Sequence, residues 1–176
     1  HIPIAPQRGQ VVVTEPLVLN NKWRHINDAG YLTTAFERNQ VARSKDPKIE
    51  FGVAATLHQG NEGNWTIGSS HEFAGYNNKV TMQVIALIVR RAIRFMPLLK
   101  DTNCIRMYAG LRPFCNADGL PILGKLDNPS GFVIATGHAG KGLTLAPITG
   151  KLISELITED RTSIPIDAFA FSRFKI

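Results

Sequence analysis

The segment from Phe132 to Leu156 constrains the fold more than any other part of the sequence. A continuous apolar run, Phe132–Thr136, predicts a buried strand. The glycine-rich turn Gly137–Gly142 (GHAGKG) follows, and a helix is then predicted from about Leu143 to Leu156, provided that Pro147 lies in its first turn. A strand, a glycine turn and a helix in this order leave backbone N–H groups free at the positive end of the helix dipole. Such a site suits a phosphate or another delocalised anion.

The usual nucleotide-binding fingerprints are absent from the chain. No G-x-G-x-x-G occurs anywhere in it. The residues Gly119–Lys125 have the glycine and lysine spacing of a P-loop, but Leu126 follows the lysine and leaves no hydroxyl for magnesium. From these residues alone, a purely structural turn at Gly137–Gly142 is as consistent with the sequence as a ligand cradle.

The first half of the chain predicts several antiparallel strands. Two strand-like runs, Phe51–Gln59 and Asn64–Ser70, are joined by Gly60–Gly63, which is typical of a hairpin turn. The other elements predicted here are a strand at Gly9–Leu19 bent at Pro16, a strand at Gly30–Phe36 and a polar loop at Asn39–Lys48.

An amphipathic helix is predicted ahead of Pro97. Its apolar face and its polar face follow from helical spacing. We interpret it as a core helix with a solvated arginine face, and a helix that faces an anion or a membrane surface is the alternative. The apolar face comprises Val84, Ile85, Ile88, Ala92 and Phe95, and the polar face comprises Gln83, Arg90 and Arg94.

Beyond this helix the pattern changes. Ile105–Ala109 predicts a short strand, and a Gly/Pro-rich stretch, Gly110–Gly124, follows it. The tail contains Phe169, Phe171 and Phe174, and we expect it to pack as a cap onto the body of the protein.

Composition excludes several classes of protein. The 176 residues are 44% apolar and 19% charged, which is globular rather than disordered. The longest apolar tract, Val84–Val89, is far shorter than the roughly 20 residues of a membrane-spanning helix. The two cysteines, Cys104 and Cys115, are too few for a disulfide framework or a closed thiolate zinc site. We expect a cytoplasmic location, with peripheral membrane association within a complex as the alternative.

The net charge permits a nucleic-acid partner without requiring one. The chain has 20 Lys and Arg against 14 Asp and Glu, a formal charge of +6. Because the basic residues are interleaved with acidic ones, we expect no nucleic-acid partner.

A few side chains are candidates for chemistry. Arg112, held in stiff backbone before Pro113, can bind a carboxylate with both arms of its guanidinium, and an internal ion pair to Asp118 is the alternative. Among the histidines, His138 is the one expected to contact a ligand, and their scattered positions predict no metal site. The run Ser69–Glu72 contains a hydroxyl, an imidazole and a carboxylate, but adjacent strand residues point to opposite faces and cannot form a triad together.

Several motifs occur in one order, and together they resemble a known family. The string is similar to the C-terminal part of the D-amino-acid oxidase, glycine oxidase and sarcosine oxidase superfamily of FAD-dependent oxidoreductases. The resemblance covers essentially the whole chain. The motifs are Arg8–Val13, Gly63–Ser70, Ala109–Pro113, Asp118–Gly124, Ala135–Leu143, Ala146-Pro147 and Ser172–Phe174.

The resemblance implies a reaction and a set of site residues. Arg112 matches the arginine that holds the carboxylate of an amino-acid substrate, and Tyr108 and His58 are further expected substrate-binding residues. The substrate is expected to be a small amine or amino acid, and hydride transfer from its carbon to flavin N5 would give an imine, with the protein supplying orientation and electrostatics. The expected cofactor-binding residues are Gly137, His138, Ala139, Gly140, Lys141, Gly142, Leu143 and Thr144.

The sequence differs from members of this family at two positions that bear on the site. Members with covalent flavin have a cysteine before a Met-Tyr pair, whereas Arg106 precedes Met107-Tyr108 here, so non-covalent FAD is expected. Gly140 stands where the glycine oxidases have an arginine, so a second carboxylate clamp is expected elsewhere or not at all.

The resemblance therefore implies an α+β chain. Residues 1–105 are expected to form an antiparallel or mixed substrate-binding sheet with a flanking helix, and residues 106–176 to form the C-terminal strand, glycine turn and helix that complete an FAD-binding domain. The family's N-terminal Rossmann part is missing and the first residue is His1, so we expect a preceding segment or a partner subunit, and no turnover from these residues alone. The alternatives are a small-subunit module that completes a flavin site on another chain, and a basic nucleic-acid-binding module.

Overall fold

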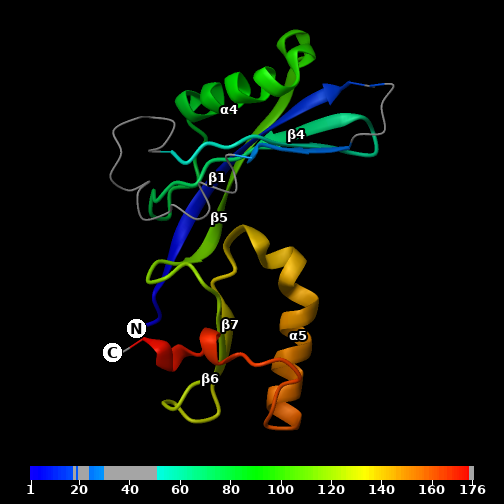
Figure 1. Cartoon of the computed structure of the whole chain (residues 1–176). Coiled ribbons are helices and arrows are strands. Elements are labelled where there is room, and N and C mark those ends of the chain that lie inside the picture. Colours follow the sequence, from blue (N-terminus) through cyan, green and yellow to red (C-terminus); the bar gives the residue numbers. More distant parts are fainter. Residues whose placement is uncertain (18, 20–23, 30–50, 175–176) are drawn as a thin grey trace. The chain divides into compact units, whose positions relative to one another are not determined.

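The computed structural model describes residues 1–17, 19, 24–29 and 51–174, which form two compact units (Figure 1). The C-terminal unit comprises His1–Gln7 and Arg112–Ile176, and the sheet unit comprises Arg8–Leu111. Each unit has its own hydrophobic core. The division into domains expected at residue 105 remains a prediction about the full-length protein. The strand and loop expected at 30–36 and 39–48 lie outside the described residues.

The sheet has the strand order β2-β3-β4-β1-β5. β1 pairs with β4, β2 with β3 and β3 with β4, each antiparallel, as the sequence predicted. The predicted hairpin is confirmed: the N–H of Gly60 donates to the carbonyl of Asn64 at 2.8 Å, and Gly63 closes the turn at φ +84°. The strands are β1 (Ile4–Pro16), β2 (His25–Asn27), β3 (Thr56–Gln59), β4 (Asn64–Gly68) and β5 (Cys104–Cys115).

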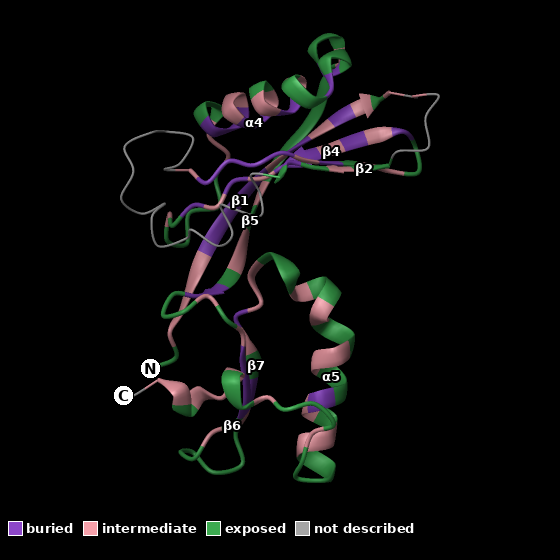
Figure 2. Cartoon of the chain, in the orientation of Figure 1, coloured by how far each residue is buried: buried purple, intermediate pink, exposed green. Residues whose placement is uncertain are grey.

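Helix α4 (Met82–Phe95) packs on this sheet through its predicted apolar face (Figure 2). Burial of each large aliphatic side chain contributes about 1.5–3 kcal/mol. Val84, Ile85, Ile88 and Ala92 are buried in one cluster with Leu57, Trp65 and Ile67 of the sheet.

Phe95 corrects one detail of the predicted face, because it is 45% exposed. It is the last residue of α4, and the chain then turns into the short 3-10 helix η1 (Pro97–Asp101). Met96 and Leu99 occupy the buried positions that the helical spacing had given to Phe95.

Strand β5 is longer than the sequence predicted. It continues from the expected Ile105–Ala109 through Gly110 and Pro113 to Cys115. β5 is the last strand of the sheet order, and an edge strand tolerates proline because one row of its N–H groups has no neighbour to bond. The pairing with β1 therefore outweighs the low strand propensity of glycine and proline.

The C-terminal unit contains the predicted strand, glycine turn and helix. β6 (Ile122–Lys125) and β7 (Val133–Thr136) form an antiparallel pair, the short helix η2 (Ala139–Lys141) follows, and α5 (Gly142–Thr158) comes next. The prediction that Pro147 lies in the first turn is wrong, because α5 begins at Gly142 and Pro147 lies inside the helix. A proline there removes the N–H that would bond to the carbonyl of Leu143.

The C-terminal tail packs as a cap, as expected. Two short 3-10 helices, η3 (Asp167–Phe169) and η4 (Phe171–Arg173), precede the last described residues. Phe171 and Phe174 pack against the core formed by Cys115, Ile122 and Ile134. Among the described residues, no helix is long and apolar enough to cross a membrane.

Candidate functional site

The glycine turn starts at a position that only glycine can occupy without strain. Gly137 has φ +82°, and a Cβ atom there would lie 3.1 Å from Cδ1 of Ile4 and 3.5 Å from Cβ of Cys115. Both contacts are made within the C-terminal unit. The turn also holds Ala139 at φ 50°, a left-handed conformation that is unusual for a residue other than glycine.

The first turn of α5 leaves its backbone donors free of side-chain caps. Lys141 is the N-cap residue, and no side chain caps the helix. The N–H groups of Gly142, Leu143 and Thr144 therefore remain at the positive end of the helix dipole. The side chain of Leu143 is 95% exposed, which places an apolar surface beside these donors.

The residues of this turn fit the flavin part of FAD. The uncapped N–H groups suit an electron-rich ring edge, and Leu143 can pack against a flat apolar ring, whereas Gly137 serves the packing of the turn against Ile4 and Cys115. The expected cofactor-binding residues Gly137–Thr144 thus form one continuous turn and helix start.

His138 contacts two other residues of the C-terminal unit. Its Nε2 lies 3.0 Å from Oγ1 of Thr149, one of the α5 residues, and its backbone forms a bridge with Phe114. Burial lowers the pKa of His138, so the ring is neutral at pH 7. A half-buried, neutral imidazole bonded to Thr149 positions the turn, and its contact with a ligand stays a prediction.

Arg112 lies near the end of β5, two residues before Phe114. The bridge between Phe114 and His138 fixes this end of β5 beside the glycine turn. Asp118, the expected internal partner of Arg112, forms its ion pair with Arg173 at 2.7 Å. The hydrogen bond from Arg173 is the main cause that lowers the pKa of Asp118.

The other two expected substrate residues belong to the sheet unit. Tyr108 is 41% exposed on β5, and the guanidinium of Arg106 lies 5.5 Å from its ring centroid. His58 is exposed on β3 opposite His25 of β2, with ring centroids 5.7 Å apart. Their roles in binding a substrate stay predictions.

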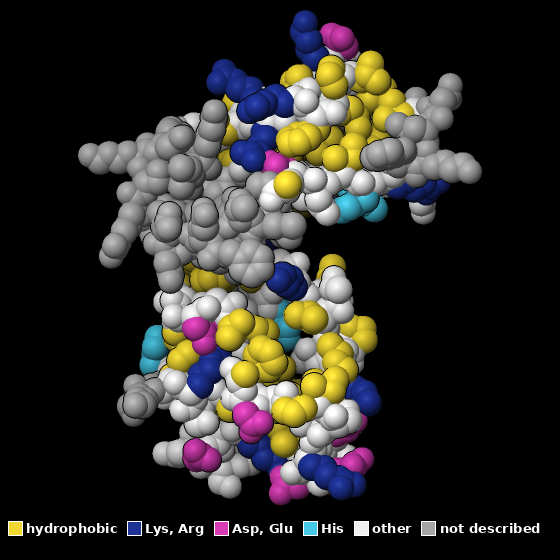
Figure 3. Space-filling view, viewed as in Figure 1, with side chains coloured by type: hydrophobic (Ala, Val, Ile, Leu, Met, Phe, Trp, Pro, Cys, Tyr) yellow, Lys and Arg dark blue, Asp and Glu magenta, His cyan; other side chains and the backbone are white. Residues whose placement is uncertain are grey.

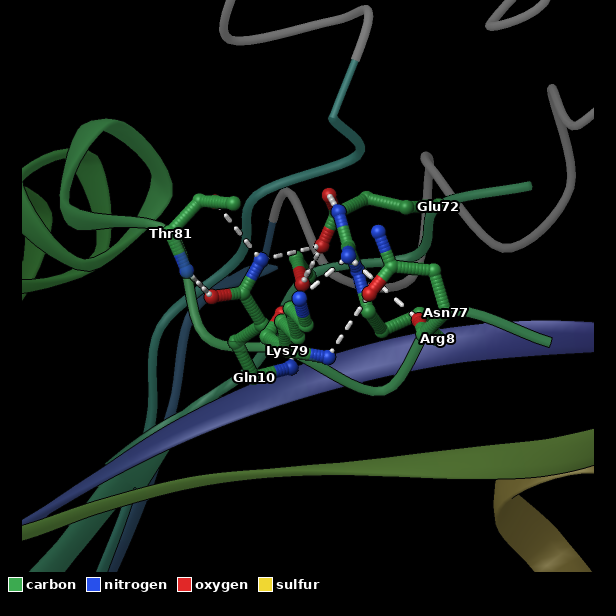
Figure 4. A network of polar contacts seen from close by, with 7 residues as sticks. Arg8, Gln10, Glu72, Asn77, Lys79 and Thr81 are labelled. Atoms are coloured by element: carbon green, nitrogen blue, oxygen red, sulfur yellow. Dashed lines mark hydrogen bonds and ion pairs between the residues drawn. The ribbon is translucent and has the colours of Figure 1, made fainter. Parts of the chain in front are cut away.

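A buried polar network that the sequence did not reveal joins β1 to the segment before α4 (Figure 4). Glu72 accepts hydrogen bonds from Arg8 at 2.6 Å, from Gln10 at 2.9 Å and from Ser70 at 2.6 Å. The side chain of Gln10 also exchanges hydrogen bonds with Thr81, the N-cap residue of α4. The run Ser69–Glu72 therefore serves this network, and Ser70 and Glu72 meet because they are two positions apart.

Comparison with known proteins identifies the family of the site. The sequence model of the family described as FAD dependent oxidoreductase matches residues 1–156. The hydrogen cyanide synthase subunit HcnC of Pseudomonas aeruginosa is 33% identical over 176 residues, which are 99% of this chain and 36% of that protein. This chain thus spans about a third of the length of that relative.

Solved structures show the same fold. The L-proline dehydrogenase from P. horikoshii matches with a TM-score of 0.79 and 23% identity, over 98% of this chain and 41% of that one. The glycine oxidase from Geobacillus kaustophilus matches with a TM-score of 0.76 and 20% identity, over 99% of this chain and 40% of that one. The α+β architecture predicted from the sequence is therefore confirmed.

Proposed function

Because this chain belongs to the family of FAD-dependent oxidoreductases, we propose that the protein containing it oxidises the amine of a small amino acid. The observation that carries this proposal is the bridge between Phe114 and His138. Through it, the strand end with Arg112 lies beside the turn that fits the flavin. The names of two fold relatives, glycine oxidase and L-proline dehydrogenase, support a small amino acid as the substrate class.

In this proposal Arg112 holds the substrate by its carboxylate. A guanidinium presents two parallel N–H donors, which match the two oxygens of a carboxylate and fix its orientation. With the carboxylate fixed, the carbon next to it has one position relative to the glycine turn, and this orientation lowers the entropic part of the barrier. FAD, when bound, supplies the acceptor for the hydride that leaves this carbon.

The start of α5 supplies the electrostatic part of the mechanism. The N–H groups of Gly142, Leu143 and Thr144 stabilise negative charge that develops next to them, because their dipoles already point in the required direction. Leu143, which is 95% exposed here, would exclude water from the same place once a flavin or further protein covers it, and a drier site strengthens these interactions. Non-covalent FAD is part of the proposal.

The uncovered apolar residues of α5 support a site that is completed by further protein. Leu143 is 95% and Ile157 is 59% exposed, whereas Leu152 is buried. Because this chain spans 36% of the length of its relative HcnC, further protein can cover these side chains. We propose that this part carries the adenine and pyrophosphate half of the FAD site.

The experiment compares substrates with and without a carboxylate. Steady-state kinetics of the full-length protein are measured with each active amino acid and with the amine that lacks its carboxylate, such as proline against pyrrolidine. For Arg112→Lys we expect kcat/KM to fall about 10- to 100-fold for the amino acid and to change little for the amine, because lysine keeps the charge but loses the two parallel N–H donors that match a carboxylate.

A matched control is Arg161→Lys, at an arginine whose side chain is 84% exposed. It should leave both substrates unchanged. Equal losses for the amino acid and the amine, or no loss for either, would show that Arg112 does not hold the carboxylate. A preparation of the full-length protein that oxidises neither class would contradict the proposed activity itself.

A further inference from the structure

Helix α4 of the sheet unit borders a pocket. None of the described residues that line it has a role in the proposed function. Its described lining residues are Val53, Leu87, Arg90, Arg91 and Arg94, and its volume is about 190 Å³. Four of these residues have the spacing i, i+3, i+4 and i+7, which places them on one stripe of the helix surface. Figure 3 shows Lys and Arg side chains gathered over α4.

Among the described residues, the positive charges that line the pocket are only partly balanced. Arg91 forms an ion pair with Asp28, whose side chain is only 7% exposed, so this positive charge is balanced. Within the described part of the chain, no ion pair is recorded for Arg90 or Arg94. These two exposed arginines are four positions apart on the helix, where like charges repel. An anion between them would remove this repulsion.

The floor of the pocket is apolar. Val53 is 4% exposed and belongs to the core of the sheet unit, and Leu87 packs against the same core. The stems of the arginines are themselves apolar and extend the wall toward the charged rim. A cavity of about 150 Å³ is large enough to hold benzene, so 190 Å³ accommodates a small ring next to the cationic rim.

We propose that this pocket binds an organic phosphate monoester. The phosphate carries about −1.5 to −2 charges at pH 7, which matches Arg90 and Arg94, two arginines without an ion pair among the described residues, better than a single carboxylate does. The apolar body of the ester lies against Leu87 and Val53. Arg91 is fixed by Asp28 and holds the shape of the pocket between them.

The test uses phenyl phosphate as the probe. Its binding to the full-length protein is measured by titration calorimetry, together with binding to Arg90→Gln, Arg94→Gln and the double variant. We expect each single change to weaken binding about tenfold, as for the loss of a charged hydrogen bond, and the double change to abolish it. Raised salt should weaken binding by the parent protein.

The matched control is Arg161→Gln, which removes another exposed arginine from the other unit. It should bind phenyl phosphate as tightly as the parent. Unchanged melting temperatures would show that the α4 variants remain folded, which is expected because both arginines are exposed.

Two further ligands separate the contribution of the charge from that of the apolar body. Inorganic phosphate lacks the body and benzoate lacks the second charge, and both should bind at least tenfold more weakly than phenyl phosphate. Equal binding of either one would overturn the proposal, and so would unchanged binding by the double variant. Binding of the protein to vesicles with anionic lipid through Arg90 and Arg94, without binding of phenyl phosphate, would instead assign this face to a membrane surface.

Discussion

The carboxylate of Asp118 accepts two hydrogen bonds from the guanidinium of Arg173, one from Nε at 2.7 Å and one from Nη2 at 3.2 Å. Arg173 also donates to the carbonyls of Phe169, Ala170 and Leu120. The C-terminal tail is thereby tied to the turn that precedes β6. The pair also takes the carboxylate that the sequence offered as a partner for Arg112.

Asp118→Asn is expected to destabilise the protein in a pH-dependent way. The hydrogen bond from Arg173 lowers the pKa of Asp118 below its ordinary value of 3.8. The stabilisation is therefore complete above about pH 5, and it is lost as the pH falls through the lower pKa of the folded state. Since the pair is partly exposed, we expect a loss of about 1 kcal/mol at pH 7.

The measurement is the melting temperature of both proteins from pH 7 to pH 2.5. The difference between them should shrink as the pH falls below about 4. Asp127→Asn is the matched control, because Asp127 is an exposed turn residue, and it should lie close to the parent throughout. A constant difference between Asp118→Asn and the parent across this range would contradict the prediction.

Glu72→Gln is expected to be one of the most destabilising single substitutions in the sheet unit. Glu72 is 5% exposed and pairs with Arg8, which is 6% exposed. Removing one charge of a buried pair leaves the other uncompensated and costs about 3–5 kcal/mol. The free energy of unfolding in denaturant measures this loss.

A milder change keeps this prediction testable if Glu72→Gln fails to fold. Ser70→Ala removes the 2.6 Å hydrogen bond to Glu72 and the 3.0 Å hydrogen bond that Ser70 Oγ accepts from the N–H of Gln10, and it should cost about 2 kcal/mol. The exposed Glu62→Gln should stay within about 0.5 kcal/mol of the parent. Equal free energies of unfolding for these three variants would show that the buried pair of Arg8 and Glu72 contributes nothing to stability.

The sequence predicted the elements that depend on residues close to one another in the chain. The helical spacing from Val84 to Ala92, followed by Pro97, was sufficient for α4, and four turn residues were sufficient for the hairpin between β3 and β4. The extension of β5 through Gly110 and Pro113 was not predictable in this way. It depends on pairing with β1, and about ninety residues of sequence separate the two strands.

In the candidate site, too, some features follow from neighbouring residues and others from contacts between distant segments. The glycine turn was located from its own residues, but the need for glycine at position 137 comes from its φ of +82° together with the contact with Ile4, at the opposite end of the chain. The choice of Arg173 as the partner of Asp118, and the convergence of Arg8, Gln10 and Glu72, are likewise contacts between distant segments. A single sequence carries no local signal for them.

Alanine at two glycines should have opposite effects on stability. Gly137→Ala places a Cβ 3.1 Å from Ile4 and forces alanine into φ +82°, which together should cost about 1–3 kcal/mol. Gly150 lies inside α5 with nothing within 4 Å of a new Cβ, so Gly150→Ala should stabilise the helix by about 0.5–1 kcal/mol. Unfolding in denaturant measures both, and the same sign for the two variants would contradict the structural role of Gly137.

His138→Asn should remove part of the protein's sensitivity to mild acid. Burial lowers the pKa of His138 below its ordinary value of 6.5, so the unfolded chain binds a proton more readily than the folded one. Folding stability therefore falls as the pH drops below about 6.5, by at most about 1.4 kcal/mol for each pH unit, until the pH reaches the lower pKa of the folded state. The variant lacks this contribution, so its melting temperature should change less than that of the parent between pH 7.5 and pH 5.

Thr149→Val is the control for this prediction. It removes the hydroxyl that lies 3.0 Å from Nε2 of His138 and should lower stability by about 1 kcal/mol. The slope of stability with pH should remain, because burial of His138 causes it. An identical slope for His138→Asn and the parent would show that this histidine does not titrate between the folded and unfolded states.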